Sequence, residues 1–197
     1  MTHLDESAFL QLFKVKPDRA FQMLMNAFRD RVYLFCLRAA ANADDAQDLA
    51  QETFIRVWKG LENFRGDSSL TTWIYRIAWN VSASYLERKG NAPDMVGYEE
   101  EEDEDETPRI VVSTEDSGFK DFENRQFLET LFQKIPASHR LVLTLYYLQE
   151  QTYEEISAVT GWPMGSVKAT LHRAKARLRE AALTEMKGER VTEGLPI

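Results

Sequence analysis

Eight consecutive acidic residues interrupt this 197-residue chain, from Glu99 to Glu106. Such a run cannot be buried and repels itself into an extended form, so no single core can continue through it. The surrounding residues from Gly90 to Gly118, which include Pro93 and Pro108, favour a flexible linker. The sequence therefore predicts two folded parts joined by an acidic tether. From the residues alone, a merely solubilising role and an active role for the acids are equally supported.

The acidic run also accounts for the net charge. The chain has 24 Lys and Arg against 32 Asp and Glu, a formal charge of −8, and the eight acids of the run carry all of that excess. The rest of the chain carries equal numbers of acidic and basic residues, so the negative net charge does not exclude binding to nucleic acid.

Apolar residues at helical spacing predict helices in both parts, and no segment shows sustained strand alternation. One helix covers Phe21 to Phe35. A second follows Asp45, with Trp58 among the residues of its inner side, and a third runs from Leu70 to Arg88 after a turn at Gly66. The expected fold class is all-α, with two small helical domains.

The stretch from Thr152 to Arg179 has the pattern of helix, tight turn and second helix. Thr152 and Glu155 have the spacing of a capping box, and Gly161 suits the turn. From Met164 to Arg179 every charged residue is basic. A helix so charged suits the major groove of DNA and its phosphates, whereas an ordinary surface helix is normally mixed in sign.

The third helix has an unusual second face. Trp73, Arg76, Asn80 and Ser84 share helical spacing, and Tyr75 and Trp79 flank them. Aromatic rings stack on unpaired bases, while Arg and Asn bond to phosphates and base edges, so the mixture suits single-stranded DNA. A protein interface explains the same residues equally well at this point.

Composition narrows the function classes further. No apolar run approaches the ~20 residues of a membrane span, and the N-terminus lacks a signal segment, so a cytoplasmic protein without membrane insertion is expected. Cys36, the only cysteine, lies in an apolar run and is expected to be a buried, inert thiol. The three histidines lack ligand spacing, so no metal and no cofactor are expected.

Two strings together carry a family resemblance. DDAQDLAQETFIRVWKGLENFRGDSSLTTWIYRIAWNVSASYLERK, from Asp44 to Lys89, resembles region 2 of the bacterial extracytoplasmic function (ECF) sigma factors, group 4 of the sigma-70 family. IPASHRLVLTLYYLQEQTYEEISAVTGWPMGSVKATLHRAKARLR, from Ile135 to Arg179, resembles their region 4. The resemblance implies a region 2 domain over residues 1–89, a linker over 90–118, a region 4 domain over 119–187 and a tail over 188–197.

The resemblance also implies roles for residues. Region 2 of the family docks on the β′ clamp helices of core RNA polymerase, here through Asp48, Gln51, Glu52 and Ile55. Its minus-ten reader flips a base of the non-template strand into a pocket, here with Phe64, Arg65, Trp73, Tyr75, Arg76, Asn80 and Ser84. Region 4 meets the β flap and reads the minus-thirty-five duplex, here with Ser166, Lys168, Thr170, His172, Arg173 and Arg177. His172 is equally compatible with a solvated face.

The sequence thus predicts an ECF sigma factor, with no catalytic residues, that binds core polymerase and promoter DNA, both duplex and single-stranded. An anti-sigma factor is the expected inhibitor, and control by abundance or by the acidic linker are alternatives. A stand-alone helix-turn-helix regulator would leave the Asp48 face unexplained. A nuclease holding Mg²⁺ on Glu99 to Glu106 is disfavoured because metal sites need carboxylates on a fixed frame.

Overall fold

The computed structural model describes residues 6–91, 93 and 127–192, with side chains as far as residue 185. The acidic run from Glu99 to Glu106 and most of the predicted linker lie outside the described residues. The described part of the chain is helical without strands, which confirms the all-α class. A helical stretch at 127–133 accompanies α1 (Glu6–Val15), α2 (Pro17–Ala40), α3 (Ala43–Gly60), the short η1 (Leu61–Asn63), α4 (Leu70–Arg88), α6 (Ala137–Leu143), η2 (Thr144–Leu148), α7 (Tyr153–Thr160) and α8 (Met164–Thr192).

The first helical unit consists of α1 to α4 around an apolar core. All four helices contribute fully buried side chains to this core, Phe9, Leu24, Val57 and Ile74 among them. Local signals fix where the helices begin. Asn42 accepts a bond from the Asp45 N–H at 2.9 Å at the start of α3, and Ser69 accepts one from the Thr72 N–H at 3.0 Å at the start of α4.

The second unit contains the predicted helix-turn-helix. The capping box of Thr152 and Glu155 is present at the start of α7, and Gly161 ends that helix with φ of +76°. The side chains of Val167, Leu171 and Ala174 are buried and form the inner side of α8. This helix continues well beyond Arg179, to Thr192.

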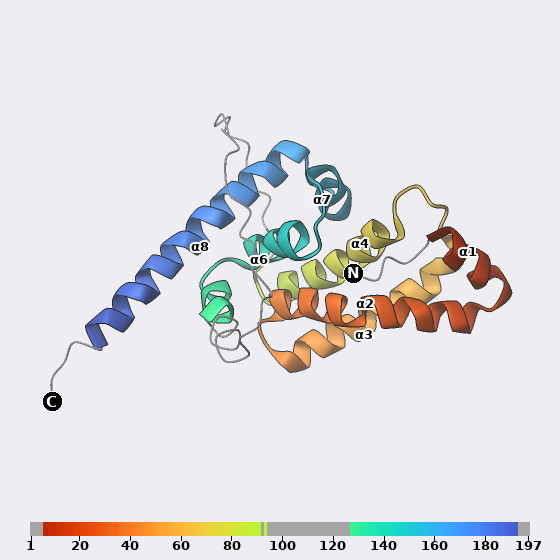
Figure 1. The fold of residues 1–197 in the computed structure, drawn as a ribbon, viewed down its shortest axis with the longest axis horizontal. Coiled ribbons are helices and arrows are strands. Elements are labelled where there is room, and N and C mark those ends of the chain that lie inside the picture. Colours follow the sequence, from red (N-terminus) through yellow and green to blue (C-terminus); the bar gives the residue numbers. More distant parts are fainter. Residues whose placement is uncertain (1–5, 92, 94–126, 193–197) are drawn as a thin grey trace, which may run out of the picture.

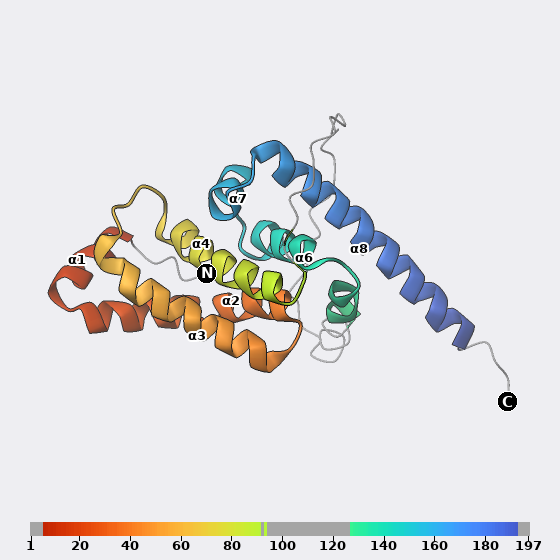
Figure 2. The same cartoon turned by 180° about the vertical axis from the view of Figure 1, so that it is seen from behind.

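The two units pack against each other. Figures 1 and 2 both show α6 and α7 against α2 and α4, with α3 on the opposite side of the first unit and the end of α8 projecting away. This contact leaves α4 between α2 and α7. One consequence for the fold is that Trp79, expected at the edge of an exposed face, is buried.

Candidate functional surfaces

The outer side of α3 forms the first candidate surface. Asp48, Gln51 and Ile55 are exposed, and Ile55 keeps 41% of its surface in solvent. Glu52 is half-buried, and its Oε1 accepts a bond from Nε of Arg56 at 2.7 Å. Phe54 lies inward. The predicted separation of an outward polar face from an inward apolar face is therefore present on α3.

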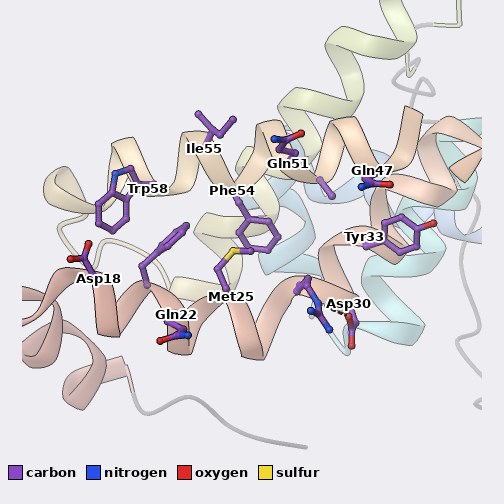
Figure 3. Close-up of a pocket in the computed structure, with 13 residues that line it drawn as sticks. Asp18, Gln22, Met25, Asp30, Tyr33, Gln47, Gln51, Phe54, Ile55 and Trp58 are labelled. Atoms are coloured by element: carbon purple, nitrogen blue, oxygen red, sulfur yellow. Dashed lines mark hydrogen bonds and ion pairs between the residues drawn. The ribbon is translucent and has the colours of Figure 1, made fainter. Parts of the chain in front are cut away.

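The outward residues Asp48, Gln51, Glu52 and Ile55 are called the α3 ridge. An open groove of about 1020 Å³ lies beside this ridge, between α2 and α3. Figure 3 shows Phe54 of α3 and Met25 of α2 meeting between the two helices, with Tyr33 and Gln47 at one end and Asp18 and Trp58 at the other. Gln51 and Ile55 line both this groove and a second hollow of about 790 Å³, which lies between α3 and α4. The ridge therefore stands between two depressions.

Trp58 corrects one prediction. Its position on α3 was assigned to the inner side, but it retains 38% exposure. Its ring lies edge-on to Phe21, with the centroids 4.8 Å apart, at the rim of the groove. The sequence pattern does not reveal the groove, because Phe21 and Met25 share the apolar spacing of the buried residues of α2.

The outward face of α4 forms the second candidate surface. Arg76, Asn80 and Ser84 are exposed along it, as is Arg65 in the preceding loop. The half-buried rings of Phe64 and Trp73 lie 5.1 Å apart at its beginning. A Cβ at Gly60 would approach Cζ2 of Trp73 to 2.9 Å, so the end of α3 fits closely against this ring. Each of the predicted minus-ten residues except Tyr75 thus keeps accessible surface.

Tyr75 is the exception, and its predicted exposure is wrong. The side chain is fully buried, with its ring edge-on to Phe35 at 5.6 Å. Burial raises the pKa of its hydroxyl, and the nearby Arg31 opposes that rise. Tyr75 lies one turn before Trp79 on the stripe of α4 that faces α2 and α7, so no base can stack on it in this arrangement.

The third candidate surface lies on α8. Lys168, His172 and Arg177 are exposed and Arg173 is half-buried, so the basic side of the helix is presented to solvent. The Lys168 ammonium lies 5.5 Å from the ring centroid of Tyr153 on α7. The helix that was predicted to enter a duplex groove therefore carries accessible cations along its outer side.

Two predicted contacts on α8 are not accessible. Ser166 keeps only 5% exposure and Thr170 none, because both share the inner side of the helix with Val167 and Leu171. The expectation that Ser166 and Thr170 face a duplex is therefore wrong for this arrangement.

A buried histidine lies behind the basic side of α8. His139 of α6 is 3% exposed, and burial, together with the charges of Arg177 and Arg173, lowers its pKa to about 4. A neutral imidazole here adds no further positive charge beneath the two arginines. Cys36 is also buried, and burial raises the pKa of its thiol to about 12, as expected for an inert cysteine.

Comparison with known proteins identifies both units. The Sigma-70 region 2 family matches residues 24–92, and the Sigma-70 region 4 family matches residues 126–178. The chain is 32% identical to the RNA polymerase sigma-H factor of Pseudomonas aeruginosa over 167 residues, which is 83% of this chain and 86% of that protein. It is 30% identical to the ECF RNA polymerase sigma-E factor of Escherichia coli K12 over 175 residues, or 87% and 91% of the two chains.

Solved structures share the fold. CnrH, solved in complex with the cytosolic domain of CnrY, matches with a TM-score of 0.59 at 19% identity, over 91% of this chain and 96% of that one. The sigma factor RpoE of Bartonella quintana, solved with the anti-sigma factor NepR, matches with the same TM-score and identity, over 82% and 95%. In the described part of this chain no helix is both long and apolar enough to cross a membrane. The two family matches, together with the two relatives at 30% and 32% identity, place the chain in the ECF group of the sigma-70 family, whose members are generally not enzymes and which bind core RNA polymerase and direct it to promoters.

Proposed function

We propose that the α3 ridge and the groove beside it are where this sigma factor binds the β′ clamp helices of core RNA polymerase. The observation that carries this assignment is the exposed line of Asp48, Gln51 and Ile55 next to the apolar groove. A partner helix with basic and apolar side chains would match the ridge in charge and fill the groove. In this proposal the region 4 unit contacts the β flap of core polymerase.

Promoter reading is divided between α4 and α8 in this proposal. Arg76 and Asn80 on α4 would hold an extruded base of the minus-ten element, with Phe64 and Trp73 as stacking rings. Extruding a base costs a few kcal/mol, which binding energy offsets without ATP. Lys168, His172, Arg173 and Arg177 on α8 would contact the minus-thirty-five duplex.

Core-dependent transcription tests the proposal. The purified chain would be added to core polymerase on a pool of genomic fragments, and the transcripts would be sequenced. We expect defined new 5′ ends that require both the chain and the core enzyme. Specific duplex binding by the chain alone, with no new transcripts, would favour a stand-alone regulator instead.

We also propose that an anti-sigma factor covers the polymerase-binding face when the protein is inactive. The sigma factor and its inhibitor would then both be in the cytoplasm, where core polymerase is. Support comes from the exposed apolar side chains Ile55 and Trp58, which keep 41% and 38% of their surface in solvent. Two fold relatives were solved in complexes with CnrY and with the anti-sigma factor NepR. Affinity purification from uninduced cells should recover a stoichiometric inhibitor. Recovery only alone or with core polymerase would leave abundance or the acidic linker as the control.

A further inference from the structure

We propose that two residues outside α4, Glu6 and Gly60, fix the position of the Trp73 ring, and that opening of the minus-ten element depends on them. This inference rests on the proposed function, in which Phe64 and Trp73 are the stacking rings of the base pocket. Both are positioning residues, because each acts through α4 or its ring rather than on a base. They belong to α1 and to the end of α3, so parts of the chain that are distant in sequence would set the place of one ring.

Gly60 is the last residue of α3, and its backbone gives no reason for a glycine. Its φ of −89° and ψ of −17° suit other residues, and alanine is the better helix former. The space beside it gives the reason. A Cβ at this position would lie 2.9 Å from Cζ2 and 3.3 Å from Cη2 of Trp73, so the ring would have to move away. The missing side chain of Gly60 therefore lets the ring lie directly against the end of α3.

The Trp73 ring also contacts Phe64, the other ring of the proposed pocket. The two centroids are 5.1 Å apart, the ring planes are tilted by 48°, and both side chains are half-buried. The backbone N–H of Trp73 donates to the carbonyl oxygen of Ser69 at 3.0 Å, which fixes the main chain beneath the ring. A Cβ at Gly60 would therefore displace the ring relative to Phe64 while the start of α4 stays in place.

Glu6 holds the start of α4 from the first helix of the chain. Its Oε1 accepts the backbone N–H of Leu70 at 2.8 Å. Leu70 is the first residue of α4, where an N–H has no helical carbonyl to bind and the helix dipole favours a carboxylate. The local cap Ser69 serves the N–H of Thr72 instead, at 3.0 Å. Phe9, one turn after Glu6, is 1% exposed and anchors α1 in the core.

Both contacts act on the same turn of α4, because Leu70 precedes Trp73 by three residues. Stacking attraction requires ring and base at van der Waals distance, so a small displacement of the ring weakens it. A ring already held in place also loses less conformational freedom when a base binds. We therefore expect loss of either contact to slow capture of the minus-ten base, and with it strand opening. Binding of core polymerase at the α3 ridge should be unaffected.

Substitutions at the two positions test the inference in the holoenzyme, on a template that the parent chain transcribes. Gly60→Ala adds the Cβ, Glu6→Ala removes the hydrogen-bond acceptor, and Glu6→Gln keeps an acceptor oxygen on a side chain of the same size. We expect Gly60→Ala and Glu6→Ala to slow open-complex formation at least fivefold, measured as the appearance of permanganate-reactive thymines. Glu6→Gln should stay within twofold of the parent. The Kd for core polymerase should stay within twofold for all three.

A second background separates displacement of the ring from a general loss of stability. Trp73→Phe keeps a stacking ring but lacks the Cζ2 and Cη2 atoms that a Cβ at Gly60 would meet. In that background Gly60→Ala should change the opening rate less than twofold. A loss of stability would slow both backgrounds by the same factor.

The outcomes separate this inference from the proposed function. Opening rates like the parent's in the Gly60→Ala and Glu6→Ala chains would overturn the inference, as would equal slowing by Gly60→Ala in both backgrounds. Slowing by Glu6→Gln as large as by Glu6→Ala would overturn the role of the hydrogen bond. Loss of core binding would overturn it too, because the residues would then maintain the first unit as a whole. If Trp73→Ala opened the promoter as fast as the parent, the proposed role of the ring would fail first.

Discussion

Charge reversal on the α3 ridge gives the sharpest test of the polymerase-binding assignment. Asp48 and Glu52 lie one turn apart, and the perturbation replaces both with Lys. The folded state should tolerate it. Asp48 is exposed, and the one ion pair lost, between Glu52 and Arg56, has partners that are 46% and 49% exposed. Such a pair contributes about 0.3–0.5 kcal/mol, so we expect the free energy of unfolding to fall by less than about 1 kcal/mol.

Binding should respond much more strongly. Close charge pairs across interfaces have coupling energies of about 1.5–7 kcal/mol each, and reversal replaces attraction by repulsion. Even the low end, taken twice, gives about 3 kcal/mol, which corresponds to a Kd for core polymerase weakened about 150-fold. Fluorescence anisotropy with labelled chain measures this Kd, and thermal unfolding followed by circular dichroism checks the fold.

The control is Glu62→Lys with Glu154→Lys, which changes the net charge equally at two exposed positions outside the groove and the ridge. Long-range attraction between the chain and polymerase would weaken binding in both double variants alike. The reasoning is refuted if the ridge variant binds core polymerase as tightly as the parent, or no more weakly than the control.

Three further predictions concern the other surfaces. Arg173→Ala should weaken binding to the upstream duplex by about 1–3 kcal/mol if the side chain reads a base, or weaken all sequences alike if it contacts phosphate, as a binding assay on matched and scrambled duplexes will distinguish. Asn80→Ala should spare upstream binding but reduce strand opening, and a normal permanganate footprint of the open complex would rule out the base-pocket role. His139 has its pKa lowered to about 4 in the folded protein, so the unfolded chain binds the proton first as pH falls below about 6.5. The free energy of unfolding should therefore decrease by about 1.5 kcal/mol between pH 6.5 and 5. His139→Asn should remove that part of the pH dependence in denaturant titrations, and an unchanged pH profile would show that another group is responsible.

Local signals explain why much of the fold was predictable. The bounds of α4, the capping box of α7 and the glycine that ends it all depend on residues within one turn of each other. The outward placement of Asp48 and Gln51 follows from the same helical periodicity that buries Phe54. These features need no knowledge of which helix packs against which.

The errors arose where a second helix decides what a side chain faces. Tyr75 and Trp79 were expected beside an exposed face, but α2 covers the first and α7 approaches the second. Trp58 was expected in the core, but it lies at the rim of the groove between α2 and α3 and keeps 38% of its surface in solvent. Thr170 follows the inner side of α8 although its polarity suggested solvent. Periodicity places residues on faces of a helix, and only the tertiary contacts decide which faces are covered.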